Sequence, residues 1–170
     1  MIRMNHNIHE LDDEFLEIIR NYQGILLKVC WIYFRTKDER EENFQEILYQ
    51  LWKSYPTLKD QSKIGSWIYK VSIFTSIVKI RKDVKMSYYD EIPESFMDDD
   101  FEDKLHRDED IARLNHAISK LNDIEKAIIM LYLEEKDYAE IADITGMSKT
   151  NIGVKILRIK EKLKSFLNND

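Results

Sequence analysis

Residues 138–164 read "YAEIADITGMSKTNIGVKILRIKEKLK", and this stretch decides which fold to expect. Asp137, followed three residues later by Glu140, forms a capping-box pattern that starts a short helix. Gly146 then supplies a turn, and Ser148 is a good N-cap for a second, longer helix. The stretch therefore predicts two helices joined by a tight turn.

Three residues in this stretch lie at the spacing of a helix-turn-helix. Ala142 is a small residue where two helices would cross, Gly146 makes the turn, and Ile152 is an apolar residue beneath the second helix. At 100° per residue, the rest of the core stripe lies within about 60° of Ile152 on the helical wheel. It consists of Ile156, Ile159, Leu163 and Leu167.

The second helix also carries a polar and basic face, about 240° to 300° round the same wheel. This face consists of Asn151, Lys155, Arg158 and Lys162. The first turn of a recognition helix can reach base edges, whereas later Lys and Arg side chains contact phosphates. The candidates for duplex DNA are therefore Ser148, Lys149, Thr150 and Asn151 at the helix start, followed by Lys155, Arg158 and Lys162. The alternative is a solvated basic face on a structural helix.

The overall charge does not exclude a DNA-binding role. The 170 residues have a formal net charge of −6, but residues 84–110 alone contain eleven acidic and three basic residues. The local potential decides nucleic-acid binding, because salt screens charges over ~8 to 10 Å. An acidic chain can therefore still carry a basic DNA-binding helix.

Residues 87–103, "SYYDEIPESFMDDDFED", contain a proline, a triple aspartate and no helical period, a composition typical of a linker. The segments on both sides have helical apolar periodicity, and the chain contains only four Gly and two Pro. We therefore expect an all-α fold with two small helical domains joined by an acidic linker, the C-terminal domain being a helix-turn-helix. The expected bounds are 1–84, 85–107 and 108–170.

Two helices of the first domain can be predicted from their apolar residues. In "EENFQEILYQLWKSY", residues 41–55, the apolar face consists of Phe44, Ile47, Leu48, Leu51 and Trp52. The opposite stripe consists of Glu42, Glu46, Tyr49 and Lys53, with Gln45 beside it, and by spacing alone it is solvated surface. After a loop that starts at Pro56, a second helix has a predicted core stripe of Trp67, Val71, Phe74 and Val78. Its other isoleucines leave almost no polar face, so this helix either packs on several sides or offers a binding surface.

Catalysis, cofactors and membrane insertion are not expected. The chain has no Gly-rich phosphate loop, no Cys/His zinc spacing and no nucleophile motif, and Asp98, Asp99 and Asp100 are consecutive side chains that do not converge on a metal by themselves. A lone Cys30 cannot form an internal disulfide. The longest apolar stretches fall short of the ~20 residues that span a bilayer, and the acidic N-terminus is unlike a secretory signal. We expect a cytoplasmic protein.

Taken in order, the two helical blocks resemble the sigma factors of bacterial RNA polymerase, of the small extracytoplasmic-function type. The resemblance rests on "EENFQEILYQLW" and "GSWIYKVSIFTSIVKIRK" in the first block and on "LNDIEKAIIMLYLEEKDYAEIADITGMSKTNIGVKILRIKEKLK" in the second. It covers about residues 12–83 and 108–165. It implies a subunit that binds core polymerase through the clamp coiled coil and the flap and directs initiation at specific promoters. It also implies an anti-sigma factor as a partner.

The resemblance assigns roles to residues of the first block. It places Glu42, Gln45, Glu46 and Tyr49 against the polymerase clamp. It also implies that the loop of residues 56–66 holds a flipped base of the melted minus-ten strand. The implied contacts with that strand are Lys63, Ser66, Lys70, Phe74, Arg81 and Lys82. The chain departs from the family at Phe74, where Asn is common, and at Val78, where a polar residue is frequent. In the second block, the helix-turn-helix would read the minus-thirty-five element as duplex DNA.

A different class of protein is also compatible with part of the sequence. Many transcriptional regulators contain a helix-turn-helix, so the chain could be a stand-alone regulator whose N-terminal block is a dimerisation or sensing module. Co-migration with core polymerase would distinguish the first hypothesis from this one. The absence of a convergent catalytic set places an enzyme third.

Overall fold

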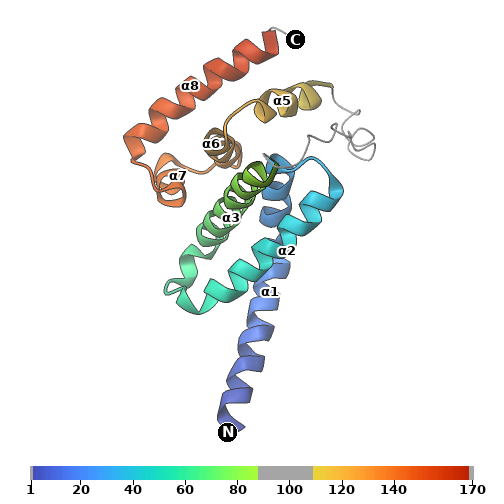
Figure 1. Ribbon diagram of the computed structural model, residues 1–170. Helices are drawn as coiled ribbons and strands as arrows, with labels where there is room; N and C mark the ends of the chain where they lie inside the picture. Colours follow the sequence, from blue (N-terminus) through green and yellow to red (C-terminus); the bar gives the residue numbers. More distant parts are fainter. Residues whose placement is uncertain (1, 88–108, 169–170) are drawn as a thin grey trace.

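A computed structural model describes residues 2–87 and 109–168, and all regular secondary structure in these ranges is helical. The N-terminal group contains α1 (Ile2–Tyr33), α2 (Lys37–Ser54) and α3 (Ile64–Ser87). The C-terminal group contains α5 (Glu109–Ser119), α6 (Asp123–Leu133), α7 (Tyr138–Thr145) and α8 (Lys149–Asn168) (Figure 1). The all-α prediction is confirmed. Within the described ranges, no helix has the length and apolar content needed to span a bilayer.

The connection between the two groups lies mostly outside the described residues. α3 continues to Ser87, so its last three residues, 85–87, fall within the predicted linker. Residues 88–108, which include Asp98, Asp99 and Asp100, lie outside the described ranges.

Helix α3 occupies the middle of the fold and contacts α1, α2 and α7 (Figure 1). The predicted core stripe of this helix was wrong at two positions, because Phe74 is 38% exposed and Val78 is 49% exposed. The buried residues of α3 are instead Ile64, Ile68, Tyr69, Ser72, Ile73, Ser76 and Ile77. In a helix that is apolar on nearly all sides, the sequence pattern does not show which face is buried. The helices that pack against it determine that face.

In α2 the apolar face is confirmed except at its end. Ile47 and Leu51 are fully buried, whereas Trp52 is 52% exposed. The helix begins at a capping box in which Thr36 Oγ1 accepts from the backbone of Glu39 and the Glu39 carboxylate accepts from the backbone of Thr36. The expected loop that follows contains two short 3-10 turns, Tyr55–Thr57 and Gln61–Lys63.

A buried polar cluster joins the three N-terminal helices. Asn43 of α2 is fully buried, and its Nδ2 donates to Ser76 Oγ of α3 at 2.8 Å and to Cys30 Sγ of α1 at 3.3 Å. Burial raises the pKa of the Cys30 thiol. Because buried polar groups need partners, these contacts favour one arrangement of α1, α2 and α3 over others.

The C-terminal group has the local structure that its sequence predicts. α6 and α7 both begin at complete capping boxes, with Asn122 and Asp137 as the N-caps. Gly146 ends α7 with φ 75°, the left-handed conformation that glycine adopts without a Cβ penalty. Ser148 Oγ then accepts from the backbone N–H of Asn151 and caps α8. Ile152, Ile156, Ile159 and Leu163 of α8 are buried, which confirms the core stripe.

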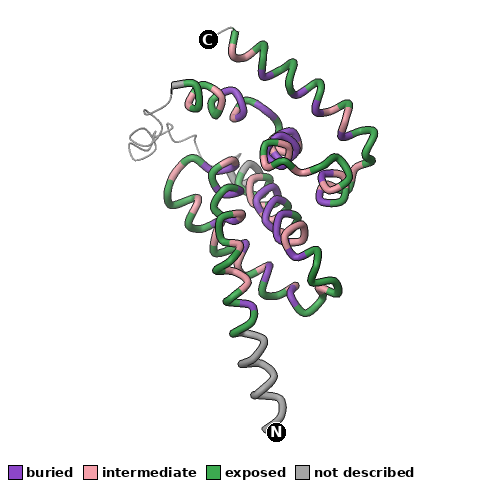
Figure 2. Tube along the Cα trace, turned by 180° about the vertical axis from the view of Figure 1, so that it is seen from behind, coloured by how far each residue is buried: buried purple, intermediate pink, exposed green. Residues whose placement is uncertain are grey.

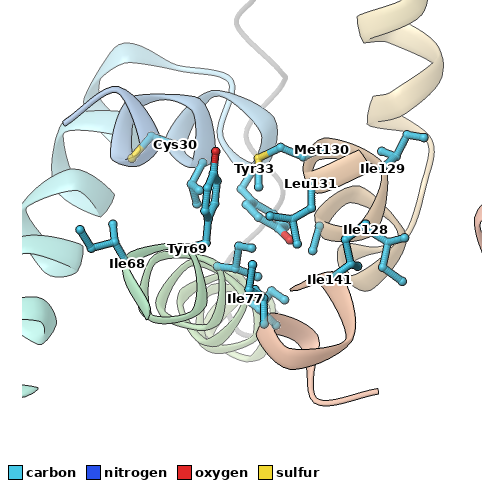
Figure 3. Close-up of a cluster of buried hydrophobic side chains, with 14 of the residues drawn as sticks. Cys30, Tyr33, Ile68, Tyr69, Ile77, Ile128, Ile129, Met130, Leu131 and Ile141 are labelled. Atoms are coloured by element: carbon cyan, nitrogen blue, oxygen red, sulfur yellow. The ribbon is translucent and has the colours of Figure 1, made fainter. Parts of the chain in front are cut away.

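The two helical groups share one apolar core. The cluster of buried side chains runs continuously from α1 and α3 into α6 and α7, and Figure 2 shows buried residues gathered where these helices meet. In the close-up of Figure 3, Tyr33 and Tyr69 lie opposite Leu131, and Ile77 lies on the side of α3 that faces α7 and Ile141. The two groups therefore form a closed arrangement, with α3 packed on both sides.

Candidate nucleic-acid and partner surfaces

The start of α8 presents polar side chains to solvent. Lys149, Thr150 and Asn151 are exposed, and Arg158 is exposed two turns further along. Lys155 is half-buried. The rest of the C-terminal group packs on the apolar side of α8 and leaves its polar side exposed. The predicted DNA-reading residues are therefore accessible, as binding in a DNA groove requires.

Lys162 differs from the other members of this basic face. Its Nζ lies 2.6 Å from Glu125 Oε1 of α6, and the Glu125 side chain is 11% exposed. Glu125 is also the third residue of the α6 capping box. In this arrangement Lys162 therefore supports the α6–α8 contact, and a DNA phosphate would have to compete with Glu125 for its charge.

A cavity of about 360 Å³ is lined by three of the six predicted minus-ten residues. Lys63, Ser66 and Lys70 line it together with Trp67 and residues 57–60 of the preceding loop. The Trp67 ring packs on Tyr55, with ring centroids 6.3 Å apart, so this residue belongs both to the core and to the cavity wall. The cavity thus combines an aromatic wall with several lysines, a combination suited to an unpaired nucleotide.

The remaining minus-ten candidates lie further along α3. Phe74 is partly exposed, and Arg81 and Lys82 are fully on the surface. At 100° per residue, Ser66, Lys70, Phe74 and Arg81 fall within about 80° of one another. One side of α3 therefore carries a continuous stripe of candidates for contact with the melted strand.

The predicted polymerase-facing stripe of α2 is accessible. Gln45 and Glu46 are exposed, and Tyr49 is 52% exposed. Glu42 is paired across the surface with Lys79 of α3, at 2.6 Å, and a hydrogen bond from Lys79 and its charge lower the pKa of the Glu42 carboxyl. Lys53 lies 6.0 Å from the centre of the Tyr49 ring. The stripe is thus a mixed polar and aromatic surface of the kind found at protein interfaces.

Sequence reasoning missed the polar contacts that hold the two groups together. They involve Lys28 and Tyr33 of α1, Tyr69 of α3, and Glu134 at the end of α6. A single tyrosine in a helix forms no recognisable sequence pattern, so the sequence does not reveal that its hydroxyl bonds to the other helical group. Among the described residues, no cluster of three or more His, Cys, Asp or Glu side chains could hold a metal ion.

The all-helical chain thus has two separate groups of candidate contacts, one on a helix-turn-helix and one on α2, α3 and the loop between them. Residues 111–163 match the family described as Sigma-70, region 4. The chain is 26% identical over 153 residues to RNA polymerase sigma factor SigV of Bacillus subtilis (strain 168), covering 89% of this chain and 90% of SigV. It is 27% identical over 154 residues to ECF RNA polymerase sigma factor SigM of the same strain, covering 89% and 94%.

A solved structure is similar over nearly the whole chain. It contains the sigma factor RpoE in complex with the anti-sigma factor NepR from Bartonella quintana, with a TM-score of 0.64, 16% identity, and coverage of 95% of this chain and 98% of that chain. At this identity the similarity establishes the fold. The sequence comparisons show that the chain is homologous to SigV and SigM and that residues 111–163 form a sigma-70 region 4 domain.

Proposed function

We propose that this chain binds core RNA polymerase and directs transcription initiation at specific promoters, without catalysis of its own. The observation that carries the proposal is the order of its surfaces along one chain. An exposed polar stripe on α2 comes first, the lysine-lined cavity beside α3 follows, and the basic recognition helix α8 comes last. Relatives that are named sigma factors match about nine-tenths of this length, which favours a sigma factor over a stand-alone helix-turn-helix regulator.

Each part of the chain has a proposed role in this mechanism. Residues 1–84 would contact the polymerase clamp through Glu42, Gln45, Glu46 and Tyr49, and would hold the melted minus-ten strand at the cavity. Residues 85–107 would connect this part to residues 108–170, which would contact the polymerase flap. There Asn151 and its neighbours at the start of α8 would read minus-thirty-five base edges in the major groove, and Lys155 and Arg158 would contact phosphates.

The cavity beside α3 suits the step in which DNA opens. Extruding a base from the stack costs a few kcal/mol, and a site that holds the extruded base offsets part of this cost. Trp67 offers an apolar wall, while Lys63 and Lys70 offer charges for the strand backbone. Duplex recognition upstream and unpaired-base recognition downstream would together select the promoter.

The same proposal includes further partners and a place of action. RpoE, a structural neighbour, was solved in complex with an anti-sigma factor, and this supports a comparable partner for the present chain. A chain that acts on core polymerase and chromosomal DNA would work in the bacterial cytoplasm. No cofactor or metal is needed for a function that consists of binding.

In vitro transcription with bacterial core polymerase tests the proposal. The purified chain, mixed with core enzyme and fragmented genomic DNA, should give transcripts whose mapped starts share two upstream sequence elements. A housekeeping sigma factor on the same templates is the positive control. A failure to co-migrate with core enzyme, combined with sequence-specific duplex binding by the chain alone, would instead establish a stand-alone regulator.

A further inference from the structure

Two apolar side chains lie on the solvent side of α8, between residues that are candidates for DNA contact. Val154 is 43% exposed, and Leu157 is 65% exposed, the largest exposed fraction among the large hydrophobic residues that the structure describes. At 100° per residue, Val154 lies on the side of α8 opposite the buried Ile152 and Ile156. Figure 2 shows that exposed residues recur along α8. Val154 and Leu157 therefore do not belong to the core stripe of this helix.

The residues at this point of α8 do little to stabilise the helix itself. Valine and glycine have lower helix propensities than alanine, and Gly153 directly precedes Val154. The Tyr138 ring of α7 lies beside Gly153, 3.6 Å from the position of an added Cβ, whereas Val154 is exposed. Residues that break a local rule of this kind are expected where a chain makes a functional contact.

The neighbours of Val154 indicate what that contact is made with. Thr150 lies one turn before Val154 and Arg158 one turn after it, so a base-reading candidate and a phosphate candidate share its face of the helix. Lys149 and Lys155 add positive charge at the edges of this face. Both borders of a DNA groove carry phosphates, so positive charge around an apolar centre complements DNA better than it complements an apolar protein groove.

The floor of the major groove presents one apolar group, the C5-methyl group of thymine. Val154 and Leu157 are three residues apart, which corresponds to a rise of about 4.5 Å along the helix axis. Successive base pairs are about 3.4 Å apart. The two side chains therefore have a spacing that lets them reach methyl groups of neighbouring base pairs.

We propose that Val154 and Leu157 read thymine methyl groups in the upstream duplex element and thereby select A·T pairs. The inference rests on the proposed function of α8 and adds two specificity-determining residues to it. Hydrogen bonds from Asn151 would distinguish base edges, and the apolar pair would distinguish thymine from bases without a methyl group. Covering one methyl group removes apolar surface from water, so each thymine methyl should tighten binding about three- to fivefold.

Replacement of thymine by uracil tests the proposal, because uracil keeps the base pair and lacks only the C5-methyl group. The full chain is bound to core polymerase, and the probe is a fluorescein-labelled duplex that carries the upstream element of a promoter mapped by in vitro transcription. Each thymine of the element, in either strand, is replaced in turn. We expect a three- to fivefold loss of affinity at one or two neighbouring base pairs. Uracil in the spacer between the two promoter elements is the control and should have no effect.

Substitutions assign the methyl contacts to side chains. Val154→Ala and Leu157→Ala should each reduce the ratio of thymine to uracil affinity to about one at its own base pair. Both positions are exposed, and alanine is the better helix former, so the unfolding temperature should not fall. Leu16→Ala, at a position of α1 that is 50% exposed, is the matched control and should keep the full effect of uracil.

The possible outcomes separate this inference from the proposed function. Equal affinity for thymine and uracil duplexes at every position would overturn methyl reading, and so would alanine variants that leave the ratio unchanged. Val154→Ala that weakens binding to core polymerase without DNA, at an unchanged ratio, would instead assign the surface to a protein contact.

A chain that fails to join polymerase but selects a duplex from a randomised library would refute the sigma-factor role alone. The same uracil series on the selected duplex would then decide on methyl reading. A chain that binds no duplex, with or without polymerase, would overturn both proposals.

Discussion

Lys162 of α8 and Glu125 of α6 form an ion pair at 2.6 Å, and the same glutamate accepts a hydrogen bond from the backbone of Asn122. Glu125 thus caps one helix and neutralises a lysine of another. If Lys162 contacts a DNA phosphate as predicted, it must first leave this ion pair, so the pair would lower the affinity for DNA.

Glu125→Gln should release Lys162 while a glutamine can still complete the α6 cap. We expect tighter DNA binding, a salt-dependence slope steeper by up to about one unit, and a loss of about 1 kcal/mol in the free energy of unfolding. Titrations at several salt concentrations and urea unfolding measure these quantities. Glu161→Gln removes the same charge from the exposed side of α8 and is the control. If it tightens DNA binding equally, the effect comes from net charge and not from the release of Lys162.

Substitution of Asn151 should change the sequence preference of DNA binding, whereas substitution of Arg158 should change the overall affinity. Arg158→Ala removes a phosphate contact, so it should weaken binding on all sequences and reduce the salt dependence. Asn151→Ala should change the preferred upstream bases, because an exposed amide in the first turn can discriminate base edges. Selection from a randomised duplex library measures both. Uniform loss across the library for Asn151→Ala would refute base reading.

Tyr49→Ala should weaken binding to core polymerase with little effect on folding. The side chain is 52% exposed on α2, so its removal leaves no cavity in the core. Affinity for core enzyme can be measured by fluorescence anisotropy, and thermal unfolding serves as the stability check. Glu41→Ala, at another exposed position of α2, is the control, and a loss of affinity that is equal for the two variants would argue against a specific clamp contact.

Phe74→Ala and Ile73→Ala should affect different properties although the residues are adjacent. Ile73 is 1% exposed, so its truncation should lower the free energy of unfolding by about 2 to 5 kcal/mol. Phe74 is 38% exposed on the side of α3 proposed to face the melted strand, so its truncation should cost less stability and should weaken binding of single-stranded DNA. Unchanged single-strand affinity for Phe74→Ala would remove this residue from the minus-ten surface.

The Tyr69 hydroxyl predicts a loss of stability at high pH. Burial, followed by the neighbouring Glu134 carboxylate, raises the Tyr69 pKa from 10.0 to about 12. The folded state therefore holds this proton more tightly than the unfolded chain does. The resulting stabilisation is complete below about pH 10 and is lost as the pH rises through about 12. Tyrosinate absorbance of the chain minus that of Tyr69→Phe measures this titration, and an ordinary pKa would contradict the buried contact with Glu134.

The helix-turn-helix can be predicted from the sequence because the residues that determine it lie close together in the chain. The Asp137 cap, the Gly146 turn and the Ile152 stripe each depend on neighbours within a few residues, and the structure confirms all three. α3 was different, since a helix that is apolar on nearly every side does not reveal its buried face. The spacing predicts Phe74 and Val78 in the core, whereas the contacts with α1, α2 and α7 bury Ile73 and Ile77 instead.

The closed contact depends on residues far apart in the chain, which explains why the sequence did not predict it. Tyr33 and Asp123 are 90 positions apart, and Lys28 and Glu134 are 106 apart. Each side chain alone resembles an ordinary surface or core residue. The buried Asn43 shows the same limitation, because its partners come from two other helices and only the assembled fold brings them together.

Because the two groups share one apolar core, any separation of the groups would expose apolar surface. Separating α3 from α7 would expose Ile77 and Ile141 to water, and exposed apolar patches promote self-association. A partner that stabilises the open chain must therefore cover this patch as well as pull the groups apart. In a cell, an opened chain without such a cover would be prone to aggregation and a target for chaperones and proteases, so its lifetime would depend on the supply of its partner.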